Sequence, residues 1–288
     1  MGSQVVVRRA VGAAVLPLLA FATGCSSEPG PSRPEATAGE RSSSRAPGTS
    51  APDPTATTDP PQRPPRYHPL STEVDAEAKR VAARAVEALP RVRRVTYTQY
   101  FGYLPPRADI LVEADFASGG GATYSVLISR PGDRWRVDDV REAHPPAALP
   151  DPGPLARRVL DSNRITLPWA GRADVAAGDV ADAVLRSMLA IARQHTIGVS
   201  VLISAHPVDV FGTDRRSDHP DGRAYDIGRI DGRLVVFPGT MGRVRDVMRL
   251  AAGTGAYQVG GPEDLDGGGS QYFSDATHSD HVHVGFPG

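Results

Sequence analysis

Ten prolines among the 41 residues from Ser26 to Arg66 set the strongest limit on what this chain can fold into. The same segment contains no Val, Ile, Leu, Met or aromatic residue. It therefore has no apolar surface to bury, and burial is what offsets the entropy that a chain loses when it becomes ordered. Its proline density favours extended polyproline II instead. We predict a disordered spacer over residues 25–66 and place the folded domains after it.

The residues before this spacer have the pattern of a bacterial export signal, which we predict over residues 1–24. Two arginines precede a 14-residue apolar stretch, Ala10–Thr23, which is shorter than the roughly 20 residues of a membrane-spanning helix. The stretch ends at Ala22-Thr23-Gly24-Cys25, which resembles the lipobox of bacterial lipoproteins. That resemblance implies cleavage before Cys25 and acylation of its thiol. The protein would then lie in the cell envelope, lipid-anchored on the outer face of the cytoplasmic membrane.

Composition excludes several classes of protein. Cys25 is the only cysteine, which rules out disulfides within the chain and zinc clusters built from cysteine. A formal net charge of -1 argues against binding nucleic acid through a bulk basic surface. Lys79 is the only lysine among 32 basic residues, and we attribute this to a bias in nucleotide composition rather than to a function. We expect the protein to be a monomer.

Residues 67–144 are predicted to form a small α+β domain. Thr72–Asp75 has the form of a capping box, and apolar residues then recur at helical spacing until Pro90 ends the pattern. Trp135 and Tyr124 are expected in the core or at an interface. Turn-forming Pro and Gly separate four extended runs, Val95–Tyr103, Ala108–Phe116, Thr123–Ser129 and Arg134–Val140. We assign no chemistry to this domain.

A second proline-rich linker over residues 145–154 leads to a larger domain over residues 155–288, again of the α+β class. Its strongest pattern is an amphipathic helix at Val180–His195, which a buried strand follows at Val199–Ser204. Asp231-Gly232 predicts a hairpin turn. About 130 residues are enough for a core of their own.

The chemistry of this larger domain is concentrated in its histidines and aspartates. A catalytic zinc takes three nitrogen or oxygen ligands and keeps one open position. His219, Asp226 and His283 could supply two imidazoles and a carboxylate, and Gly222 would allow a tight turn between the first two. Side chains alternate along a strand, so His281 would share the face of His283 while the intervening valine faces the core.

Five residues, Ser217, His219, Gly222, Ala224 and Asp226, match the pattern S-x-H-x-x-G-x-A-x-D. This pattern resembles the signature of the zinc D-Ala-D-Ala peptidases of bacterial cell walls, which include DD-carboxypeptidases, DD-dipeptidases and phage endolysins. They share their fold with the hedgehog signalling domain and the lysostaphin-type endopeptidases. The resemblance covers about residues 161–288 and implies a central antiparallel sheet with flanking helices.

The resemblance also implies roles for individual residues. The family's zinc ligands are the histidine and aspartate of the signature, here His219 and Asp226, and the last histidine of a C-terminal motif. That motif is matched by Asp280-His281-Val282-His283, which makes His283 the third ligand. Asp280 would be the general base, and His281 would stabilise the transition state. If the strand is regular from Ser279, Asp280 faces away from both histidines and His281 becomes the better candidate for the base.

The chain departs from the family where many members carry an arginine that holds the substrate or its oxyanion. The corresponding segment, Ser204–Pro207, has none. Three residues are weaker candidates for this substrate-binding role: His206, Arg215 and Arg216. We expect Ser217 to orient the ligand loop by hydrogen bonding rather than to act as a nucleophile. We expect His278 to be a surface residue.

Together these features predict a zinc-dependent metallopeptidase that hydrolyses peptidoglycan stem peptides as a DD-carboxypeptidase or an endopeptidase. The metal would lower the pKa of its bound water to about 7. One alternative is a lipoprotein that keeps the peptidase fold but only binds wall peptide or a protein partner. Another is a zinc peptidase that acts on proteins or small peptides.

Overall fold

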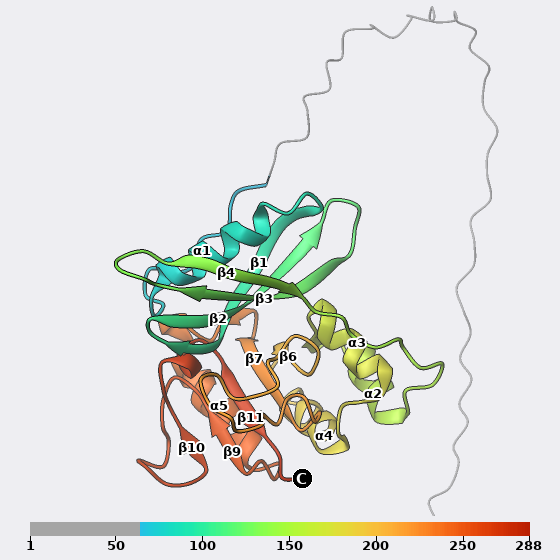
Figure 1. Ribbon diagram of the computed structural model, residues 1–288. Coiled ribbons are helices and arrows are strands. Elements are labelled where there is room, and N and C mark those ends of the chain that lie inside the picture. The colour runs from blue at the N-terminus through green and yellow to red at the C-terminus, as the bar shows by residue number, and fades with distance from the viewer. Residues whose placement is uncertain (1–63) are drawn as a thin grey trace, which may run out of the picture. The chain divides into compact units, whose positions relative to one another are not determined.

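A computed structural model of the chain describes residues 64–288 (Figure 1). The predicted signal peptide, Cys25 and the predicted spacer as far as residue 63 lie outside the described residues. The described residues belong to one compact unit. Its described part holds helices and two β-sheets, which confirms the α+β class. Within residues 64–288, no helix combines the length and the apolar character needed to cross a bilayer.

The first sheet is an antiparallel meander in the order β1-β2-β3-β4, with α1 packed on one face (Figure 1). Its elements are α1 (Ala76–Glu87), β1 (Val92–Leu104), β2 (Arg107–Phe116), β3 (Gly121–Ser129) and β4 (Arg136–Glu142). The predicted helix and four strands are confirmed. The predicted helix start is wrong, because the side chain of Asp75 rather than that of Thr72 caps α1 by accepting the N–H of Ala78.

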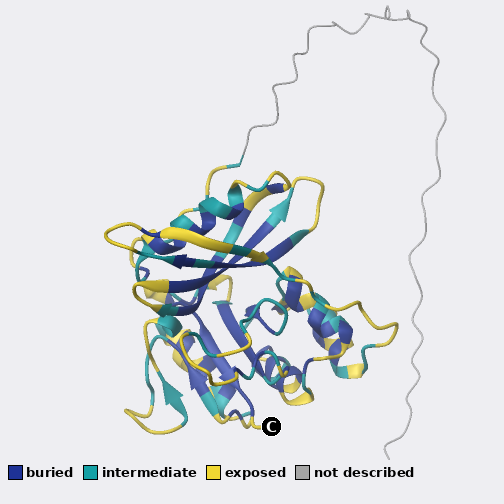
Figure 2. Cartoon of the chain, viewed as in Figure 1, coloured by how far each residue is buried: buried dark blue, intermediate teal, exposed yellow. Residues whose placement is uncertain are grey.

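Both faces of the first sheet are buried along its central strands (Figure 2). On β2, Ile110 and Val112 belong to the core that α1 covers. The residue between them, Leu111, points the other way and packs with Phe101 and with Val201 of the second sheet. Because successive side chains of a strand face opposite sides, one continuous apolar run on β2 serves two different cores. Trp135 and Tyr124 are buried, as expected.

The second sheet is mixed and has the order β10-β9-β11-β7-β6-β5, with β8 also paired to β7. The pairs β5–β6 and β9–β10 are parallel, and the other pairs are antiparallel. Its strands are β5 (Ile165–Thr166), β6 (Ile197–Val201), β7 (Ala224–Ile230), β8 (Arg233–Leu234), β9 (Gln258–Gly260), β10 (Tyr272–Phe273) and β11 (Val282–Gly285). The helices of this part are α2 (Pro154–Leu160), α3 (Trp169–Ala177), α4 (Asp182–Ile191) and α5 (Met241–Ala252), with short 3-10 turns η1 (Pro238–Thr240) and η2 (Thr277–Ser279).

The alternation of side chains on β7 and β11 separates the core of the second sheet from its polar face. Tyr225 and Ile227 of β7, together with Val282 and Val284 of β11, belong to the apolar core that α4 and α5 complete. The residues between them are Asp226 and His283, whose side chains lie on the opposite face, which the first sheet covers. Polar groups are therefore buried between the two sheets.

Two predicted boundaries in this part of the chain are wrong. The helix predicted at Val180–His195 is α4, which ends at Ile191, and the strand predicted at Val199–Ser204 is β6, which ends at Val201. The strand stops because a buried carboxylate captures the amides that would continue its ladder: Asp174 accepts the N–H groups of Ile203 and Ser204 at 2.9 and 3.0 Å.

The predicted hairpin turn between β7 and β8 is confirmed. Asp231 and Gly232 have φ values of 49° and 76°, the positive pair that a type I′ turn requires. The second proline-rich segment has no helix or strand before α2 begins at Pro154. The limits of the two folded domains stay a prediction.

Candidate metal centre

The register between two neighbouring strands places the first two candidate ligands side by side. His283 of β11 is paired with Asp226 of β7 in the antiparallel ladder. Directly opposed residues have Cβ atoms about 5 Å apart, so their side chains meet on the face that the first sheet covers. The distance between His283 Nδ1 and Asp226 Oδ1 is 3.0 Å.

The third candidate ligand, His219, comes from the loop that precedes β7. Its Nδ1–H donates to the carbonyl of Leu202 at 2.8 Å, which turns Nε2 toward the other two groups. Gly222 closes the loop by donating its N–H to the His219 carbonyl at 2.9 Å. Gly222 has a φ of 67°, and a Cβ there would lie 2.2 Å from the carbonyl oxygen of Asp179. Glycine is required at this position for both reasons.

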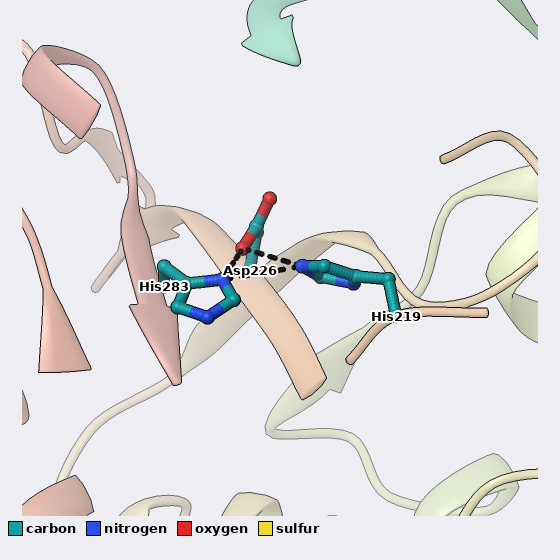
Figure 3. A group of neighbouring side chains, drawn as sticks. All are labelled: His219, Asp226 and His283. Carbon is teal, nitrogen blue, oxygen red and sulfur yellow. Dashed lines mark hydrogen bonds and ion pairs between the residues drawn. The ribbon is translucent and has the colours of Figure 1, made fainter. Parts of the chain in front are cut away.

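The three donor atoms form a small triangle (Figure 3). His219 Nε2 lies 3.2 Å from His283 Nδ1 and 3.3 Å from Asp226 Oδ1. Donors bound to one ion at about 2 Å in tetrahedral directions are separated by about 3.3 Å. All three side chains are buried. Two imidazole nitrogens and one carboxylate oxygen therefore fit a divalent metal ion with an open coordination position.

The electrostatics of the site favour the protonation states that metal ligands need. Burial lowers the pKa of His283 to about 4, so its imidazole is neutral near pH 7. Burial alone would raise the pKa of Asp226, but His281 and His219 outweigh it and hold that pKa well below its usual value. A neutral imidazole and an ionised carboxylate are the forms that bind a cation.

His281 and Asp280 form a buried pair beside the three ligands. Asp280 Oδ1 lies 2.7 Å from His281 Nδ1, and His281 Nε2 lies 3.6 Å from Asp226 Oδ2. Asp280 precedes β11 and both of its oxygens are engaged, since Oδ2 accepts the N–H of Tyr100 at 3.1 Å. Of the two, His281 is the one that lines the adjoining cavity. The geometry thus places Asp280 behind His281, where it fixes the ring orientation.

A cavity of about 440 Å³ opens onto the site between the two sheets. Strand β1 contributes Phe101 and Leu104 to its lining, and the loop between β6 and β7 contributes Phe211, which packs on Gly102 of β1. His281, His283 and His219 line its floor. A cleft that combines aromatic side chains with convergent polar groups is the usual form of a small-ligand site.

The residues predicted to replace the family's arginine lie in different places. His206 stacks on the ring of His219, with centroids 4.2 Å apart, and its Nδ1 lies 2.7 Å from the carbonyl of Pro207. Arg215 lines the cavity, whereas Arg216 pairs with the exposed carboxylate of Asp221 at 2.6 Å.

Ser217 lies where a residue that orients the ligand loop would be expected. It lines the cavity, and its Oγ accepts the N–H of His219 at 3.3 Å.

Sequence reasoning missed several residues of the site. His278, expected to be a surface residue, is half-buried at the cavity: its ring centroid lies 5.0 Å from that of His281, and its Nδ1 lies 2.7 Å from Asp275 Oδ1. Both residues line the cavity. The small domain, to which no chemistry was assigned, contributes Lys79 and Gln99, which contact Asp280 and Asp226. For Lys79, the sequence signal was its position beside the apolar stripe of a predicted helix. For Gln99, it was a position on the inward face of a predicted strand.

The chain was compared with models of protein families, with curated proteins and with solved structures, and none of the three comparisons gave a match.

Proposed function

We propose that this protein is a zinc-dependent peptidase of the cell envelope that hydrolyses peptidoglycan stem peptides. The observation that carries the proposal is the convergence of three donor atoms at 3.0–3.3 Å at the floor of an open cavity. His219, Asp226 and His283 would hold the ion. A bound zinc supplies an acidified water and polarises a carbonyl in this kind of site.

The protein's own groups suit the proton transfers of amide hydrolysis. Asp280 accepts the Nδ1–H of His281, which leaves His281 Nε2 directed toward the ligands and the cavity. Burial alone would lower the pKa of His281, but Asp226 and Asp280 outweigh it and raise the pKa. A charged His281 would stabilise an oxyanion, and a neutral one would accept a proton from water. This assigns the proton transfer to His281 and a positioning role to Asp280.

The substrate class rests on the sequence pattern and on the cavity. The five-residue signature and the Asp280–His283 motif resemble those of zinc D-Ala-D-Ala peptidases, and we propose the same hedgehog/DD-peptidase fold for residues 155–288. Arg215 is the one arginine among the described residues that line the cavity, which include no lysine, so it would hold a peptide carboxylate. A lipid on Cys25 would keep the enzyme near its substrate.

A non-catalytic binding module is the second candidate. Two observations favour it, namely the missing arginine in Ser204–Pro207 and the engagement of both Asp280 oxygens. It predicts that the metal-loaded protein binds wall peptides without cutting them.

Metal content of the purified protein tests the proposal. Wild type should contain one zinc per chain after dialysis against zinc, and His219→Ala should contain none. His68→Ala, which removes an exposed histidine, should load as wild type does. Mass spectrometry of purified wall after digestion should then show cleaved stem peptides, with casein left intact. A wild type that takes up no zinc overturns the proposal, and a loaded wild type that binds but never cuts wall peptide establishes the binding module.

A further inference from the structure

Strand β1, at one edge of the first sheet, lies beside the candidate metal centre. β1 is an edge strand, since it pairs only with β2 in the described sheet. Its outward amides are satisfied by the C-terminal segment: Tyr100 N–H donates to Asp280 Oδ2 at 3.1 Å, and Tyr103 N–H donates to Thr277 Oγ1 at 3.0 Å. Edge amides need partners when they are buried. Here the partner is the carboxylate that holds His281.

The only lysine of the chain reaches the same carboxylate from α1. Lys79 is completely buried, and its Nζ lies 2.5 Å from Asp280 Oδ2 and in contact with the carboxylate of Glu73. Burial alone would lower the pKa of Lys79, but Asp280 and Glu73 outweigh it and raise the pKa. A compact ammonium fits between two carboxylates where the planar guanidinium of arginine is larger. This explains a lysine in a chain that otherwise uses arginine.

A buried side chain of β1 reaches the candidate ligand Asp226. Gln99 Nε2 donates to Asp226 Oδ2 at 2.7 Å, and its Oε1 accepts the hydroxyl of Ser200 at 2.5 Å. An ionised carboxylate only accepts hydrogen bonds, so the amide nitrogen must face Asp226. The bond occupies Oδ2 and leaves Oδ1 turned toward the two imidazoles, as Figure 3 shows.

We propose that the catalytic centre is composite, with Lys79 of α1 and Gln99 of β1 acting as positioning residues for a site whose ligands come from β7, β11 and the loop before β7. Gln99 fixes the ligand Asp226, and Lys79 fixes Asp280 and through it His281. The inference rests on the proposed function. It makes the small domain a structural part of the enzyme rather than an accessory to it.

Gln99→Leu in the full chain tests the first half of this inference. Loss of the bond to Asp226 should weaken zinc affinity by about 10–100-fold, as is typical when a group that orients a ligand is removed. Chelator competition measures the affinity, and the visible absorption of the Co²⁺ form should change shape. Ser200→Ala is the milder variant: it removes one of the two hydroxyl donors to Gln99 Oε1 and leaves that of Tyr97 at 3.1 Å, so it should weaken affinity in the same direction but by less. Gln194→Leu, at an exposed glutamine, is the matched control and should bind as wild type does.

Lys79→Met tests the second half through a separation of kcat from KM. Because Lys79 lies behind His281 and away from the cavity lining, kcat should fall about 10–100-fold while KM stays within about threefold. Lys79→Met/Glu73→Gln removes the unpaired carboxylate as well, and it replaces the single variant if that one fails to fold. Arg80→Met removes an exposed cation from the same helix and should leave kcat unchanged.

A double-mutant cycle separates positioning from general destabilisation. If Lys79 acts through Asp280, then Lys79→Met/Asp280→Asn should have the kcat of Asp280→Asn alone within about threefold, because groups that act as a unit are non-additive. Independent losses that multiply would assign Lys79 a merely structural role.

The failure of this inference is distinguishable from failure of the proposed function. A wild type without zinc refutes the function. A wild type that loads zinc and cuts wall peptide, together with folded Gln99→Leu and Lys79→Met/Glu73→Gln variants that match it in affinity and kcat, refutes the composite centre alone.

Discussion

The two sheets of this protein differ in which of their strands pair: the second sheet also has consecutive pairs, but β11 pairs with strands that are not its neighbours in the sequence. In the first sheet every strand pairs with its neighbour in the sequence. In the second sheet, β7 and β11 pair although Asp226 and His283 are 57 positions apart. Pairing between distant segments has the larger loop-closure cost, whereas a meander forms from local contacts. Two of the three candidate ligands, Asp226 and His283, thus lie on the sheet whose register depends on long-range pairing, and the locally built sheet covers them.

This difference shows that a sheet that carries none of the candidate metal ligands can still fix the positions of the side chains that do. The first sheet buries one face under α1 and the other against the second sheet. Polar side chains between the two sheets must then find partners across the interface, because an unpaired buried group is costly. Gln99 with Asp226 is such a pair, and Lys79 of α1 adds a contact of the same kind with Asp280 of the C-terminal segment.

The largest expected change in the free energy of unfolding comes from core substitutions, which test whether the two sheets unfold together. Ile110 of the first core and Ile227 of the second are both completely buried. Replacing either with alanine should lower the free energy of unfolding by about 2–5 kcal/mol through lost burial and a residual cavity. Because buried ion pairs and hydrogen bonds join the sheets, both variants should shift one common transition in calorimetry and in urea.

Two separable transitions, with Ile110→Ala shifting only one, would show instead that the sheets are independent domains. Val137→Ala on β4 is the control for truncation at an exposed position, and it should change the free energy of unfolding by less than about 0.5 kcal/mol.

A smaller effect concerns a buried acid between the two sheets. Glu113 of β2 accepts the N–H of Trp169 and the hydroxyl of Thr123, and burial raises its pKa from 4.5 to about 7. The folded state therefore binds this proton more tightly than the unfolded state. Its contribution to stability is fully present below about pH 4.5 and is lost as the pH rises through about 7, by up to about 3 kcal/mol.

Glu113→Gln should remove this slope from the free energy of unfolding measured between pH 4 and 8. Carbon NMR of the labelled Glu113 carboxyl measures the pKa directly. A midpoint near 4.5, or a slope that persists in the glutamine variant, would show that this carboxyl is not the group that couples the interface to pH.

Sequence periodicity predicted the first sheet well because each of its strands and turns is marked by residues within that same short segment. Each strand alternates or runs apolar, and Pro or Gly marks the turns, so β1 to β4 were located from the sequence. The three ligands were located by motif spacing, and the structure brings them together. The end of β6 was missed because the carboxylate of Asp174, on α3, captures the next amides, a contact that no local pattern reveals.

The supporting residues were missed for a different physical reason. Lys79 and Gln99 belong to no sequence motif. A polar residue at a position that faces the core only interrupts the apolar periodicity, and periodicity alone does not indicate its partner. Their significance lies in a partner 201 and 127 positions away respectively. The available signal was the single lysine placed beside Ala78 in the buried stripe of α1, which compositional bias alone does not explain.

The smallest expected effect contrasts an exposed ion pair on α4 with the buried pair of α1. Arg186 and Asp182 lie at i and i+4 with an N–O distance of 2.7 Å, and both side chains are 63% exposed. Water screens such a pair and side-chain entropy opposes it, so Arg186→Ala should cost less than about 0.5 kcal/mol in urea unfolding. Lys79→Met, at the buried pair, should cost several times more because it leaves two carboxylates without their cation. Equal costs would mean that the ammonium of Lys79 is solvated, and that α1 and the first sheet cover the candidate metal centre without holding it.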